Sequence, residues 1–151
     1  MRVMKKILLS AVLAAMLVTS SLFAAGVPEI NAKALSTFNS QFANATDVDW
    51  SVGENYYKAD FRYNNNYVAA YYNTEGEFIA TVRNISSLNL PVTLQTNLKN
   101  HYSSYWISDL YEVAKAESIS YYITLENADQ KIVLKSTGGS DWSIHKKSNK
   151  A

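Results

Sequence analysis

The sequence contains no cysteine. This absence excludes disulfides, thiol catalysis and thiolate metal sites. The five glycines form neither a glycine-rich phosphate loop nor a Gly-x-Ser-x-Gly elbow, which removes two common enzyme signatures. If the chain is exported, packing must carry its stability, because no covalent cross-link is available.

Histidine is also scarce. His101 and His145 are the only two in the chain, and neither has a second histidine at metal-ligand spacing. Asp47 and Asp49 are spaced as in a calcium-binding loop, but the remaining EF-hand positions are missing. The sequence therefore offers no metal-ligating cluster.

A pair of carboxylates for acid–base catalysis is equally hard to find. Asp60 and Glu77 are the candidates, but Lys58 and Arg62 flank Asp60. Charges of opposite sign on neighbouring strand positions favour ion pairing. We therefore expect a protein that is not an enzyme, with no catalytic residue and no cofactor.

The chain has one long apolar run, and it lies at the N-terminus. Arg2, Lys5 and Lys6 precede an apolar segment at 7–18, and small residues follow it. This order is typical of a secretory signal peptide, and the run is shorter than the ~20 residues of a membrane-spanning helix. We predict that residues 1–25 are a signal peptide, that the mature chain is periplasmic or secreted, and that no stable membrane anchor remains after cleavage.

An excess of charge of one sign is lacking as well. Of 14 basic residues three lie in the first 25 positions, which leaves 11 against 13 acidic residues, a net charge of −2. Such a chain has no basic footprint for nucleic acid. We interpret the lysines at 146, 147 and 150 as a solvated C-terminal tail.

Tyrosine is abundant, and it is concentrated in alternating runs. Residues 56–81 read YYKADFRYNNNYVAAYYNTEGEFIAT, which predicts an antiparallel meander with one buried and one solvated face. A turn at Asn64–Asn66 would place Tyr63 opposite Tyr67. The predicted buried face then comprises Tyr57, Ala59, Phe61, Tyr63, Tyr67, Ala69, Tyr71, Phe78, Ala80 and Val82.

The opposite face of this meander has a moderately apolar middle and charged edges, a combination that can mark an interaction site. Tyr56 and Tyr72 are the predicted aromatic anchors, and Lys58 and Arg62 the charged contacts, since tyrosine and arginine are favoured at binding hot spots. The alternative is an ordinary solvated sheet face with a few exposed apolar residues.

Periodicity predicts the remaining elements. Residues 106–116 alternate as a strand, although a short helix is also possible. One helix and four strands follow each other twice, over about 28–84 and 90–146. We expect an α+β fold of two tandem helix-plus-four-strand antiparallel units, with the helices packed on one face of the sheet. The predicted helices are 28–43 and 90–102, and the strands outside the meander are 46–52, 106–116, 120–126, 131–135 and 141–145.

Several motifs resemble one family. They are Phe38-x-x-x-Phe42-Ala43-x-Ala45-x-x-Val48-x-Trp50, Tyr57-x-Ala59-x-Phe61, Ala70-Tyr71-Tyr72-Asn73-x-Glu75-Gly76 and Leu90-Pro91. Together they are similar to the beta-lactamase-inhibitor-like, PepSY-like family of exported bacterial proteins. The resemblance implies a single PepSY-like domain over 27–151, a fold like that of the beta-lactamase inhibitor protein, and no catalytic residues.

We therefore expect a non-enzymatic exported binding module that recognises a periplasmic protein or peptide through its exposed sheet face. The alternative is an inhibitor of a periplasmic hydrolase, such as a peptidase or a beta-lactamase. No inhibitory contact residue can be matched position by position, and a shared fold does not by itself give function.

Overall fold

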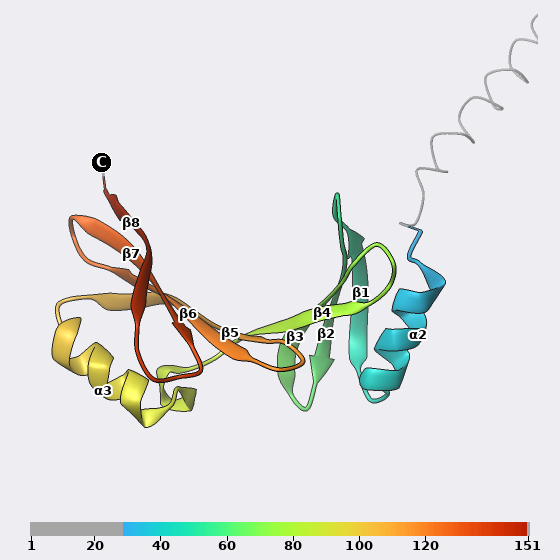
Figure 1. Cartoon of the computed structure of the whole chain (residues 1–151), viewed down its shortest axis with the longest axis horizontal. Helices are drawn as coiled ribbons and strands as arrows, with labels where there is room; N and C mark the ends of the chain where they lie inside the picture. Colours follow the sequence, from blue (N-terminus) through green and yellow to red (C-terminus); the bar gives the residue numbers. More distant parts are fainter. Residues whose placement is uncertain (1–28, 151) are drawn as a thin grey trace, which may run out of the picture.

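The computed structural model describes residues 29–150, so the predicted signal peptide lies outside the described residues. Eight strands form one antiparallel sheet in the order β1-β2-β3-β4-β5-β6-β7-β8 (Figure 1). No helix of the described part is long and apolar enough to cross a membrane. The elements are α2 (Ala32–Gln41), β1 (Thr46–Val52), β2 (Tyr57–Tyr63), β3 (Asn66–Tyr72), β4 (Phe78–Asn84), the 3-10 turn η1 (Ser87–Asn89), α3 (Val92–His101), β5 (Trp106–Ala114), β6 (Ile119–Glu126), β7 (Gln130–Thr137) and β8 (Ser143–Asn149).

The prediction of two tandem helix-plus-four-strand units is wrong. Strand β4 pairs with β5 from Thr81↔Ala114 to Asn84↔Tyr111, which makes the eight strands one continuous sheet with two short helices. Periodicity reports local elements but says nothing about pairing between strands far apart in sequence. The β4–β5 pairing satisfies backbone groups that two separate sheets would leave open at their edges.

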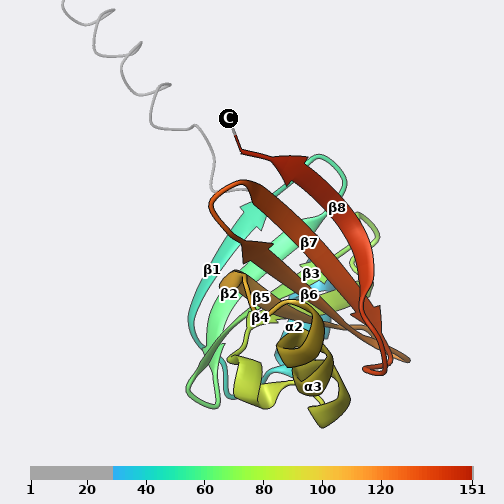
Figure 2. The ribbon, with the colours of Figure 1, turned by 90° about the vertical axis from the view of Figure 1, so that its left-hand side faces the viewer.

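The sheet is curved and twisted. In Figure 1 the strands at its two ends rise from a floor of β4 and β5, and both helices lie on the outer side of the curve. Figure 2 shows β7 and β8 crossing β1 and β2 at a steep angle, the twist expected to accumulate over eight strands. One face of the sheet is thus covered by the helices and the other is open.

The register of the β2–β3 hairpin differs from the predicted one. Asn64 and Asn65 have φ values of 49° and 63°, as a two-residue hairpin turn requires. Tyr63 therefore pairs with Asn66, and Ala59 pairs with Ala70. A turn shorter by one residue sends the whole of β3 to the other face, so the predicted buried placement of Tyr67, Ala69 and Tyr71 is wrong.

Two hydrophobic clusters lie between the sheet and the helices. Below α2 the cluster is rich in aromatic rings, and Phe38 packs edge-on against Phe61 with ring centroids 4.9 Å apart. Below α3 the cluster is mostly aliphatic. Its fully buried members include Leu94, Ile123 and Leu134. These clusters hold the helices on one face, and within residues 29–150 no element covers the opposite face.

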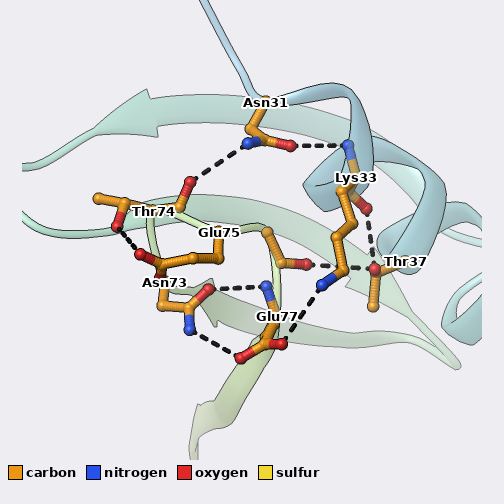
Figure 3. A network of polar contacts seen from close by, with 8 residues as sticks. Asn31, Lys33, Thr37, Asn73, Thr74, Glu75 and Glu77 are labelled. Atoms are coloured by element: carbon orange, nitrogen blue, oxygen red, sulfur yellow. Dashed lines mark hydrogen bonds and ion pairs between the residues drawn. The ribbon is translucent and has the colours of Figure 1, made fainter.

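Helix α2 is also tied to the β3–β4 turn by a polar network (Figure 3). Asn31 caps the helix by accepting from the Lys33 amide at 2.8 Å, and its side-chain amide donates to the Thr74 carbonyl at 3.2 Å. Lys33 forms an ion pair with Glu77 at 3.3 Å. The network fixes the N-terminal end of the helix against the turn.

The C-terminal strand lies later in the chain than predicted. β8 runs from Ser143 to Asn149, so Lys146 and Lys147 are strand residues and not part of a solvated tail. Lys150 is held as well, because its side chain forms an ion pair with Glu126 at 2.7 Å and its amide donates to the Asp129 carbonyl. The strand reading of 106–116 is confirmed by β5.

Candidate functional site: the helix-free face

The surface of the sheet opposite α2 and α3 is here called the helix-free face. Alternation along each paired strand assigns its residues, because Ala59, Ala70 and Thr81 pair in one row that points toward the helices. The helix-free face comprises Lys58, Asp60, Arg62, Tyr67, Ala69, Tyr71, Ala80, Val82, Tyr111, Val113, Tyr122, Val133 and Lys135.

Four tyrosines from three different strands, β3, β5 and β6, define this face. Tyr67 is 74% exposed, and Tyr71, Tyr111 and Tyr122 are half-buried. A tyrosine ring offers a large apolar surface and a hydroxyl that can remain hydrated. Rings held half-buried on a rigid sheet lose little further freedom when a partner packs against them.

The face is hollowed near its centre. A cavity of about 410 Å³ lies over β2, β3 and β4 and reaches β5. Ala69 and Val82 form an apolar floor, and Tyr67, Tyr71 and Tyr111 stand around it. Small floor residues flanked by rings give a depression that can receive a projecting group.

Charges border the hollow. Lys58 and Asp60 form an ion pair at 2.8 Å, and the hydrogen bond that Lys58 donates to Asp60 raises the pKa of Lys58 above its usual value. The Arg62 guanidinium lies 5.2 Å from the centroid of the Tyr67 ring, a cation–π contact. These contacts hold a polar rim beside an apolar floor.

At the far end of the face Tyr122 is held between two other side chains. The His145 ring meets it edge-on with centroids 5.6 Å apart, and the Lys135 ammonium lies 5.5 Å from its centroid. The pKa of Tyr111, between Tyr122 and the hollow, is raised by burial and by the neighbouring Asp109 carboxylate. Tyr111 therefore keeps its hydroxyl proton at ordinary pH, and these neighbours fix the position of the Tyr122 ring before any partner arrives.

Three of the four predicted binding residues come together on this side of the sheet. Lys58 and Arg62 lie on the helix-free face, and Tyr56 packs against Tyr71 at its border with ring centroids 5.6 Å apart. Tyr56 is 41% exposed. The predicted charged contacts and one aromatic anchor are thus neighbours of the hollow.

The fourth predicted residue, Tyr72, lies elsewhere, and its placement on the exposed face is wrong. It is fully buried under α2, where its hydroxyl donates to Gln41 at 3.3 Å. Burial raises the pKa of Tyr72 to about 12. The cause of the error is the one-residue change in the β2–β3 turn, which exchanges Tyr72 with Tyr71.

Sequence reasoning missed the four tyrosines of the helix-free face. For Tyr67 and Tyr71 a usable signal was present, because two-residue hairpin loops with positive φ favour Asn, and Asn64-Asn65 supplies them. For Tyr111 and Tyr122 the position depends on the β4–β5 and β5–β6 pairings, which connect residues up to 33 positions apart, such as Thr81 and Ala114. No local pattern reports that pairing.

The carboxylates considered for catalysis are engaged in ion pairs. Asp60 pairs with Lys58, and Glu77 pairs with Lys33. Within residues 29–150, no group of three or more His, Asp or Glu side chains is placed to hold a metal ion. The features of the helix-free face are those of a contact surface: tyrosine rings, an apolar hollow and a charged rim.

Comparison with known proteins bears on the fold. No protein-family model and no curated protein matches the chain. Among solved structures, a DUF2874 family protein from Bacteroides ovatus matches with a TM-score of 0.71 at 21% identity, over 80% of this chain and 88% of that one. A BLIP-like protein from Bacteroides fragilis matches with a TM-score of 0.70 at 18% identity, over 82% and 89%.

A second DUF2874 family protein, from Bacteroides uniformis, has a TM-score of 0.70 at 17% identity, over 80% of this chain and 90% of that one. Identities this low show a shared fold and nothing about shared ligands. The predicted similarity to the beta-lactamase-inhibitor-like fold is therefore confirmed, and the PepSY-like assignment stays a prediction. The chain has the fold of the BLIP-like and DUF2874 structures.

Proposed function

We propose that this chain is a non-enzymatic exported binding module that recognises a protein or peptide partner with its helix-free face. One observation carries the proposal: the half-exposed tyrosines and the hollow of about 410 Å³ gather on the face that neither α2 nor α3 covers. Aromatic residues and arginine are enriched at binding hot spots, and charged residues at the rim give specificity.

The shape favours a projecting segment of a folded partner or a peptide. The floor residues Ala69 and Val82 are small, so an inserted side chain would meet Tyr67, Tyr71 and Tyr111 at the wall. Around it, Lys58, Asp60 and Arg62 supply both signs of charge. Export to the periplasm or beyond follows from the predicted signal peptide and is part of the proposal.

The test is affinity capture from a periplasmic extract of the host, with bound proteins identified by mass spectrometry. The baits are the processed wild-type chain, a Tyr71→Ser/Tyr111→Ser variant and a control variant. The control is Leu88→Ser/Val92→Ser, which changes two apolar residues on the helix side that are 82% and 76% exposed. A protein retained by wild type and control but lost by the tyrosine variant supports the proposal.

Retention by all three baits would place recognition elsewhere and overturn the proposal, as would failure of wild type to retain any protein or peptide. Circular dichroism and thermal melting check that each bait is folded.

A second candidate, inhibition of a periplasmic hydrolase, is favoured only by the fold shared with a BLIP-like structure. A panel of peptidases and beta-lactamases assayed with the same baits separates the two. Sub-micromolar inhibition that disappears in the tyrosine variant would make the partner a hydrolase.

A further inference from the structure

The sheet ends in two open edges, β1 and β8. Every residue of β8 is exposed, and in β1 only Trp50 is partly covered. An edge strand presents unpaired backbone N–H and C=O groups, which are a template for pairing with another strand. What distinguishes these edges is the charge and the apolar residues that each carries.

The two edges carry opposite charges. β1 bears Asp47 and Asp49, and β8 bears Lys146 and Lys147. None of these four takes part in the ion pairs found among residues 29–150. Their charges are therefore uncompensated within the described chain.

Asp49 is placed against a like charge. It pairs across the strands with Asp60, whose carboxylate is already engaged by Lys58 at 2.8 Å. Like charges directly opposite each other in a sheet are destabilising. A cation arriving on the open side of β1 would relieve this repulsion.

The side chains of the two edges are also complementary on each face of the sheet. Asp49 is on the helix-free side, because it pairs with Asp60, and Lys146 is on the same side, because it pairs with Val133. On the helix-covered side each edge exposes an apolar side chain, Val52 at 48% and Ile144 at 61%. One alignment of β8 beside β1 thus brings opposite charges together on one face and apolar groups on the other.

Strand direction permits the same alignment. Each strand is antiparallel to the next over eight strands, so β1 and β8 run in opposite directions. A β8 strand added beside β1 would continue the alternation without a break. Both strands contain a bulge, which limits the regular pairing to a few residues and so favours a weak, reversible contact.

We propose that the chain associates head to tail, with β8 of one copy adding antiparallel to β1 of the next. Lysines on an edge strand commonly guard it against pairing. Here charge repulsion prevents pairing only between two identical edges. Two β1 strands would place aspartates against each other, and two β8 strands would place lysines against each other. A head-to-tail contact uses different surfaces on the two copies, so it builds open chains or a ring.

The test is sedimentation velocity on the processed chain over a range of concentrations at low salt. Wild type is expected to gain mass with concentration and to lose the association when salt is raised. Asp49→Lys and Lys146→Glu each place like charges across the contact and should weaken association on the order of tenfold or more. Circular dichroism confirms that these exposed substitutions leave the chain folded.

Mixing the two variants is the decisive step. The Lys146→Glu chain has an acidic β1 that fits β8 of the Asp49→Lys chain, and the reversed edges fit each other too. An equimolar mixture should therefore regain the association that each variant alone has lost. A wild type that stays monomeric, single variants that associate like wild type, or a mixture that stays monomeric would each overturn the proposal.

Discussion

Beneath α2 the sheet contributes small alanines among large aromatic rings, and the helix contributes the large ring of Phe38. Ala59 and Ala70 are fully buried in the floor, and Phe38 fills the space above them. The Phe38 ring meets Trp50 and Phe61 at centroid distances of 5.3 and 4.9 Å. Beneath α3 the floor is bulky, and the helix contributes a smaller side chain.

In that second cluster Ile123 and Leu134 occupy the floor and Leu94 comes from the helix. All three are fully buried. The comparison teaches that helix and sheet can divide the side-chain volume of a core between them in different proportions. Core packing tolerates such exchanges as long as the total volume fills the interface.

Both helices are nevertheless attached by the same contact. Thr37 donates its hydroxyl to the Gly76 carbonyl at 3.2 Å, and Thr93 donates to the Gly139 carbonyl at 2.8 Å. The two glycines have φ values of 79° and 81°. A glycine in a strand connection thus approaches the first turns of each helix, and its missing side chain makes the approach possible.

The largest expected loss of stability comes from disrupting the aromatic cluster beneath α2. Phe38→Ala should lower the free energy of unfolding by about 3–5 kcal/mol, because the alanine floor cannot close the cavity. Leu94→Ala removes fewer atoms and should cost about 2–5 kcal/mol, toward the lower end. Urea unfolding measures both, with Leu35→Ala, a 38% exposed position on α2, as a control near zero. Equal costs at positions 38 and 94 would contradict the proposed sharing of volume.

The next effect tests the glycine contact. A Cβ at Gly76 would lie 2.6 Å from the Ala34 backbone nitrogen, and one at Gly139 would lie 2.9 Å from a ring carbon of Pro91. Gly138 has the same positive φ of 79° but nothing within 4 Å. Gly138→Ala should therefore show only the left-handed strain of about 1–2 kcal/mol.

Gly76→Ala should cost clearly more than Gly138→Ala in the same unfolding measurement, because backbone has to move. Gly139→Ala should fall between them, since a proline ring can shift slightly. If all three substitutions cost the same, the close approach of the turns contributes nothing to helix attachment.

A smaller effect concerns the buried tyrosine of the aromatic cluster. Tyr72→Phe keeps the ring and removes the hydroxyl that donates to Gln41 at 3.3 Å. The expected loss is about 0.5–1.5 kcal/mol, the ordinary net value of one hydrogen bond. Thermal unfolding of Tyr72→Phe and Tyr71→Phe side by side checks it, since Tyr71 lies on the helix-free face and should show no loss.

The smallest expected effect is a change in stability with pH, caused by Glu126. Lys150 and Lys131 form ion pairs with Glu126 at 2.7 and 3.3 Å, and the hydrogen bonds that Glu126 accepts, first from Lys150, lower its pKa from 4.5 to about 2. A carboxyl group whose pKa is lower in the folded than in the unfolded chain contributes its full stabilisation above pH 4.5. This contribution is lost as the pH falls toward 2. Glu126→Gln should therefore be less stable than wild type at pH 6, and the difference should shrink to nothing near pH 2. A difference that stays constant over this range would exclude the ion pairs as its source.

The fold could be predicted in part because much of it is local. Alternation located the strands of the N-terminal part, and β1 has the predicted bounds of Thr46–Val52. Trp50 lies directly opposite Ala59, a contact that places a large ring over a small floor residue. Pairing of β4 with β5 was not predictable, because it depends on which backbone edges meet after a 21-residue connection of turn and helix between Asn84 and Trp106.

The site could be predicted less well, because a face depends on register. One residue in the Asn64–Asn65 turn decided whether Tyr71 or Tyr72 reaches solvent. Lys58 and Arg62 were placed correctly, since their strand alternates beside the clearly apolar Ala59 and Phe61. In β3 the neighbouring tyrosines and alanines have similar apolarity on both faces, so composition could not correct the register.

The most direct test of the central claim, that the helix-free face is the recognition face, is tyrosine nitration read by mass spectrometry. The processed chain is treated alone and with its captured partner. Alone, Tyr67 and Tyr71 should react and Tyr72 should be protected, which also tests the register. With the partner, Tyr67, Tyr71 and Tyr111 should lose reactivity, while Tyr102 on the helix side stays unchanged. Unchanged nitration of Tyr67 and Tyr71 in the complex would contradict the account.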